Sequence, residues 1–77
     1  MDKARLRWSC RRGMKELDVL LERYLAHRYD AASETEKIGF VELLAQEDPQ
    51  IWSWIMEYEP VPAGVTHDVI EQLRRHR

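Results

Sequence analysis

Apolar residues recur every three to four positions along most of this chain, and no stretch shows the alternation typical of a half-buried strand. The clearest stripe begins near Met14 and fades around Tyr29, which predicts a helix with one apolar face. The stripe consists of Leu17, Leu20, Leu21, Tyr24 and Leu25. Because 77 residues leave room for one small core, we expect a single all-α domain over residues 1–77, built as a bundle of five helices.

A short first helix is predicted over residues 3–12. Its pattern directs Ala4, Trp8 and Cys10 toward the core. Gly13 then ends the helix, because glycine readily takes the left-handed backbone found at helix C-termini. Since Cys10 is the only cysteine, the chain has no internal disulfide, and a reducing compartment is expected.

A capping box predicts that the third helix starts at Ser33. The Ser33 hydroxyl can accept from the third helical amide, while the Glu36 side chain reaches back to the Ser33 amide. We expect most of this helix to be buried, although Gly39 costs about 1 kcal/mol in helix propensity. Its apolar residues are Ile38, Phe40, Val41, Leu43 and Leu44.

A fourth helix is expected to begin with Asp48 as its cap and Pro49 at its first position, where the missing amide is no loss. Trp52 and Trp54 would point about 200° apart on this helix, so only one of them can be central. We assign Trp54 to the core and Trp52 to the surface. The apolar stripe consists of Ile51, Trp54, Ile55 and Tyr58.

Pro60 and Pro62 predict an extended connector, because proline restricts the residue before it and removes a backbone donor. Thr66 is then expected to cap a fifth helix that ends in the basic residues 74–77. The inward-facing residues of this helix are Val69, Ile70 and Leu73.

The formal net charge is only −2, but charge is distributed unevenly. Residues 1–15 hold six basic side chains and one acid, whereas residues 29–72 hold one base and ten acids. This distribution favours either mutual attraction on folding or a polarised binding surface. Residues 3–15 also place Trp8 among basic side chains. Such a pattern can bind phosphates and stack a nucleobase, although the acidic middle of the chain would repel a polyanion.

Catalysis has little support in the sequence. The serines and Cys10 lack a histidine in a position suited to activate them, and the three histidines show no metal-ligand spacing. No glycine-rich phosphate loop is present. The N-terminus lacks the apolar segment of a signal peptide, and no apolar run approaches the ~20 residues needed to cross a bilayer. We expect a soluble chain that stays where it is made.

The segment "RRGMKELDVLL", residues 11–21, concentrates charge at the start of the second helix. Glu16 lies about 110° from the leucine stripe, so its carboxylate is on the flank of the helix and accessible. In one interpretation the segment is structural: Glu16 stabilises the first turn of its own helix, Arg12 pairs with it, and Gly13 turns the chain.

The same segment resembles the Arg-Gly-x-x-Glu signature of the small succinate dehydrogenase assembly factors, which promote covalent attachment of FAD to the flavoprotein subunit. The order and spacing of the segments resemble the bacterial branch over residues 4–55, apart from Ala32, where a leucine is expected. The resemblance implies a partner-binding site. Its signature falls on Arg12, Gly13 and Glu16, with Met14 and Arg5 as further contact residues.

What the resemblance implies is an assembly factor rather than an enzyme. Its partner would be the flavoprotein subunit of succinate dehydrogenase, and also that of fumarate reductase. FAD would be the group attached to the partner, with none held firmly by this chain and with no metal. We expect a monomer in a bacterial cytoplasm that binds neither membrane nor nucleic acid. Two other classes stay open: a nucleic-acid-binding module and a toxin-neutralising partner protein.

Overall fold

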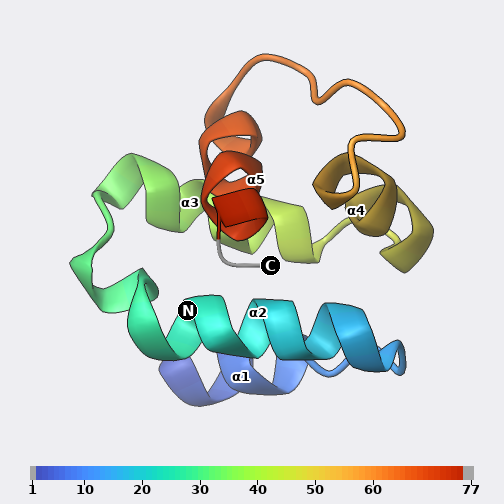
Figure 1. The fold of residues 1–77 in the computed structure, drawn as a ribbon. Coiled ribbons are helices and arrows are strands. Elements are labelled where there is room, and N and C mark those ends of the chain that lie inside the picture. The colour runs from blue at the N-terminus through green and yellow to red at the C-terminus, as the bar shows by residue number, and fades with distance from the viewer. Residues whose placement is uncertain (1, 76–77) are drawn as a thin grey trace.

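The computed structural model describes residues 2–75, and within them all regular structure is helical, as the sequence predicts. One turn of 3₁₀-helix, Tyr29–Ala31, follows the second helix. The five α-helices of the described chain are α1 (Lys3–Ser9), α2 (Lys15–His27), α3 (Glu34–Leu44), α4 (Asp48–Ile55) and α5 (Val65–Arg75). Figure 1 shows α1 and α2 stacked as one pair, with the other three helices on the opposite side of α2.

The core lies between α2 and the group formed by α3, α4 and α5. Helix α5 packs mainly across α3 and also contacts α4 and α2. The predicted stripes of α2 and α5 are confirmed, as is the assignment of Trp54 and Cys10 to the interior. Burial raises the pKa of the Cys10 thiol to about 11, so this thiol is protonated at neutral pH.

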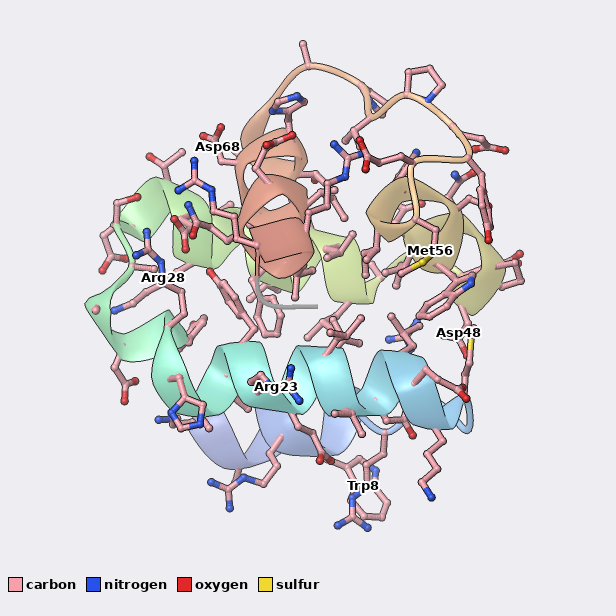
Figure 2. All side chains as sticks on the ribbon, viewed as in Figure 1. Trp8, Arg23, Arg28, Asp48, Met56 and Asp68 are labelled. Atoms are coloured by element: carbon pink, nitrogen blue, oxygen red, sulfur yellow. The ribbon has the colours of Figure 1, made fainter. Side chains whose placement is uncertain are left out.

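The prediction for the first helix is wrong in two respects. Helix α1 ends at Ser9, and its buried residue is Leu6. Ala4 is exposed, and Trp8 is 75% exposed and points away from the bundle (Figure 2). The physical reason is that a two-turn helix packed mainly on α2 buries one narrow stripe, which Leu6 and Cys10 occupy four residues apart.

Two apolar residues assigned to the interior lie at the surface. Ile38 is 54% exposed, because the buried face of α3 is the one that meets α2 and α5. Tyr58 is 72% exposed. The chain leaves α4 at Glu57, whose φ of 64° is left-handed, and this turn directs the following residues away from the helix stripe.

Two helix starts differ by one residue from the predicted caps. Glu47, rather than Asp48, is the N-cap residue of α4, so Asp48 lies in the first turn beside Pro49. Helix α5 already begins at Val65, so Thr66 is inside it. The basic end of α5 is described through Arg75, and residues 76–77 lie outside the described residues.

Gly39 has a role that helix propensity alone does not indicate. It is buried where α5 begins to cross α3, and a Cβ atom built on it would lie 2.4 Å from the Val65 carbonyl oxygen. Real Cβ atoms do not approach a backbone oxygen so closely. The absent side chain therefore permits the close crossing of the two helices.

The predicted capping box is half formed. The Ser33 hydroxyl accepts from the Glu36 amide at 3.1 Å, as expected. The Glu36 carboxylate, however, turns toward α2, where it accepts from the Tyr24 hydroxyl at 2.5 Å and from Arg28 Nε at 3.1 Å. These bonds join α2 to α3, and the hydrogen bonds from Arg28 hold the pKa of Glu36 below its usual value.

The lowered pKa of Glu36 predicts a pH dependence of stability. The ionised carboxylate stabilises the folded chain above its unfolded-state pKa of about 4.3, and this contribution is lost as the pH falls through the lower folded-state value. Glu36→Gln should therefore cost about 1–2 kcal/mol at pH 7. Denaturant unfolding of the wild type and of Glu36→Gln is measured at pH 7 and pH 3. The difference in their free energies of unfolding should be smaller at pH 3, and an equal difference at both pH values would contradict the prediction.

Candidate functional site

The loop between α1 and α2, residues 10–14, is the first part of the candidate site. Gly13 is exposed and has a φ of 87°, so the left-handed conformation predicted for it is confirmed. It lies beyond the end of α1, in the loop itself, rather than directly at the helix terminus. No heavy atom lies within 4 Å of the position where a Cβ would stand. A partner can therefore approach the backbone of this loop closely.

Asp18 shapes this loop from the first turn of α2. Its two carboxylate oxygens accept from the Arg12 amide at 2.8 Å and from the Gly13 amide at 3.3 Å. Helix α2 has no side-chain cap at Met14, so Asp18 supplies the local acceptors. Sequence analysis missed Asp18, although an acid in a first turn that follows a glycine is a signal that could have identified it.

Arg12 does not pair with Glu16, so that part of the structural interpretation is wrong. Its Nε donates to Asp48 Oδ1 at 2.6 Å. Its Nη1 donates to the Leu44 carbonyl at 2.6 Å, and its Nη2 donates to the Gln46 carbonyl at 2.5 Å. The side chain is only 16% exposed. Arg12 thus ties the loop to the turn between α3 and α4, and its direct contact with a partner stays a prediction.

Arg12→Ala should lower the free energy of unfolding by about 3 kcal/mol, because it removes several charge-assisted hydrogen bonds and leaves Asp48 without its cation. Arg11→Ala is the matched control. The Arg11 guanidinium lies in an exposed pair, 3.7 Å from Glu22, so its removal should cost less than about 0.5 kcal/mol. Urea unfolding measures the free energy of unfolding of both variants, and an equal decrease in the two would contradict the role of Arg12.

The second part of the candidate site is a shallow groove between α2 and α4, with a volume of about 490 Å³. Its lining residues are Lys15, Glu16, Val19, Leu20, Arg23, Trp52 and Met56. Figure 2 labels Arg23 on α2 and Met56, the residue that directly follows α4. Glu16 is exposed, as predicted, and Trp52 is half-buried rather than fully at the surface. The predicted signature glutamate therefore borders a groove with a largely apolar lining.

The structure places the two further contact residues differently. Met14 is half-buried, packs against the core and occupies the N-cap position of α2, next to Gly13. Arg5 is exposed on α1, where it lines a separate depression with Ala4, Trp8 and Ser9. The loop and the groove thus meet at the start of α2, whereas Arg5 belongs to a different part of the surface.

Ion pairs join the basic N-terminal segment to the acidic middle of the chain. Lys3 lies 2.7 Å from Asp30, and Arg12 lies 2.6 Å from Asp48. The uneven charge distribution therefore acts in part through attraction on folding. Within residues 2–75 no group of three or more candidate ligands could hold a metal ion, and no helix is long and apolar enough to cross a membrane.

These features describe a small helical protein whose distinctive surface combines an open glycine loop with a groove that carries the signature glutamate. The chain belongs to the family described as flavinator of succinate dehydrogenase, which it matches over residues 4–77. The resemblance drawn from the Arg-Gly-x-x-Glu segment is therefore confirmed, and the match extends beyond the segments that carried it.

Curated relatives agree with this assignment. The FAD assembly factor SdhE of Shewanella oneidensis is 40% identical over 74 residues, which cover 96% of this chain and 90% of the relative. The protein of the same name from Serratia sp. is 41% identical over 69 residues, or 88% of this chain and 78% of the relative. That from Xylella fastidiosa is 53% identical over 55 residues, or 71% of this chain and 57% of the relative.

Proposed function

We propose that this chain binds the flavoprotein subunit of succinate dehydrogenase and promotes covalent attachment of FAD to that subunit. The observation that carries the proposal is the match to the flavinator family over residues 4–77. The geometry supports it, because the signature residues Gly13 and Glu16 are exposed and lie close together at the start of α2. The flavoprotein of fumarate reductase is a second partner in this proposal.

In the proposed mechanism the chain is an assembly factor and not an enzyme. The bond between flavin and histidine forms within the flavoprotein. The factor binds the immature flavoprotein more tightly in the domain arrangement that holds the flavin methyl carbon near the accepting histidine, and thereby raises the population of that arrangement. It acts as a monomer in the cytoplasm, holds no FAD firmly itself, and dissociates before the iron–sulfur subunit assembles.

Each site residue has a physical role in this mechanism. Gly13 lets the backbone of the partner come close, because no side chain covers the loop. Glu16 offers its carboxylate to a basic group or to backbone amides of the partner. Met14 gives adaptable apolar contact next to the loop. Arg12, Asp18 and Asp48 position the loop through the hydrogen bonds described above.

The proposal is tested in a bacterial strain from which the gene for this chain has been deleted. Covalent flavin is measured by the fluorescence of the flavoprotein band after denaturing electrophoresis, and the amount of flavoprotein is measured by immunoblot. We expect the protein to be present without covalent flavin, and the plasmid-borne chain to restore the fluorescence. Normal covalent flavin in the deletion strain would refute the proposed function.

One observation favours a second candidate function, the binding of nucleic acid. The indole of Trp8 is exposed on a basic helix next to the exposed Arg5 and Arg7. Such a surface can stack a base and contact phosphates. If this candidate is correct, a single-stranded oligonucleotide should quench the tryptophan fluorescence of the unchanged chain more than that of a Trp8→Phe variant, with an affinity that falls steeply as salt is added. No quenching at low salt would exclude it.

A further inference from the structure

We propose that the groove between α2 and α4 receives an apolar side chain of the flavoprotein, carried next to a basic residue that meets Glu16. This inference rests on the proposed function and adds a second contact area to it. The family signature does not predict this contact area, because Val19, Trp52 and Met56 lie outside the Arg-Gly-x-x-Glu residues 12–16.

The apolar part of the groove comes from both helices. Val19 on α2 is 43% exposed, although it is an aliphatic side chain on a helix of a small bundle. Trp52 on α4 and Met56, the residue that follows this helix, are half-buried and pack against the core. Leu20, which is buried on α2, also lines the groove. Concave surfaces with an apolar centre and a polar rim are typical of the parts of an interface that contribute most to affinity.

The polar rim of the groove consists of one acid, Glu16, and two bases, Lys15 and Arg23. Glu16 is exposed, and it is the only acid among the described residues that line the groove. A carboxylate in this position favours a lysine or arginine beside the inserted apolar side chain. The groove also lies near the open loop at Gly13, since its lining residue Lys15 follows Gly13 by two positions. A flavoprotein surface that covers Gly13 and Glu16 therefore extends over the groove.

A second exposed apolar residue provides a comparison. Ile38 on α3 lies in another depression, with Tyr29 and Val41. The charges at its edge already have local interactions, because Lys37 lies 3.9 Å from Glu34 and over the ring of Tyr29. This depression shares no lining residue with the groove. Ile38 is thus a matched control for Val19: an exposed aliphatic residue on a helix, outside the proposed contact area.

The test compares Val19→Asn, Met56→Gln and Ile38→Asn. Binding to the purified flavoprotein subunit is measured by isothermal titration calorimetry, and folding by the melting temperature. We expect Val19→Asn and Met56→Gln to weaken binding about tenfold and to remain folded at the temperature of the titration, because each replaces an apolar contact by a polar group. Ile38→Asn should change the Kd less than twofold.

The outcomes separate this inference from the proposed function. If the unchanged chain neither binds nor flavinylates the flavoprotein, the proposed function fails and the groove has no such partner. If the unchanged chain binds and both groove variants bind equally well, the groove inference is overturned while the proposed function stands. An equal loss for Ile38→Asn would also overturn it. The inference would also be overturned if sedimentation showed that the free chain is a dimer and that the groove variants are monomers, since a second copy of the chain would then occupy the groove.

Discussion

Glu16→Ala is expected to abolish most of the flavinylation that this chain promotes and to leave the chain folded. Glu16 is exposed in the first turn of α2, so its contribution to stability is at most about 1 kcal/mol through the helix dipole. Loss of a charge-assisted contact in an interface costs about 2 kcal/mol or more, which corresponds to roughly a thirtyfold loss of affinity. Covalent flavin on the partner and the melting temperature are measured together.

Glu34→Ala is the matched control for Glu16→Ala. Glu34 is also an exposed glutamate in the first turn of a helix, α3, but it lies outside the groove and the loop. Both variants should lose similar stability, and only Glu16→Ala should lose flavinylation. Wild-type flavinylation by a folded Glu16→Ala protein would remove Glu16 from the site and leave it a structural residue.

Gly13 distinguishes the structural role from the functional one in the same assay. Gly13→Ala should cost about 1 kcal/mol, because a side chain disfavours the left-handed backbone, and flavinylation should fall little. Gly13→Arg has a similar backbone cost, since the space around the loop is open, but it places a long side chain where the partner approaches. It should therefore abolish flavinylation in a folded protein. Parallel loss of folding and activity in both variants would contradict a contact at Gly13.

Gly39→Ala is expected to destabilise the fold by about 3 kcal/mol, although alanine normally stabilises a helix interior by about 1 kcal/mol relative to glycine. The added Cβ would lie 2.4 Å from the Val65 oxygen and 2.8 Å from the Val65 carbonyl carbon, both backbone atoms at the start of α5. These atoms can move only if α5 shifts on α3 and the shared core opens. For a domain of this size the melting temperature should fall by roughly 15 °C.

Thermal unfolding followed by circular dichroism measures this effect, with Glu42→Ala as control. Glu42 is an exposed residue of the same helix, and its replacement should change stability by less than about 0.5 kcal/mol. A Gly39→Ala protein as stable as the wild type would mean that α5 does not cross α3 at this residue. Glycine would then be dispensable there.

The sequence by itself determined the helices and the local features of the site. The stripe of α2, the Ser33 cap and the left-handed Gly13 each depend on residues only a few positions apart, so local periodicity and backbone preference are enough to predict them. The exposed position of Glu16 follows in the same way, from its angle relative to the leucine stripe. The family resemblance also needed only the order and spacing of residues.

Only the tertiary structure determined which residues the polar side chains contact. Arg12 bonds to Asp48, 36 positions away, and Tyr24 bonds to Glu36 on the next helix, although local pairing had been expected for Arg12 and Glu36. The exposure of Trp8 and the groove beside Glu16 depend on how the helices cross. A periodic pattern tells which face of a helix is apolar, but not which helix covers it or how completely, because that depends on contacts between residues distant in the sequence.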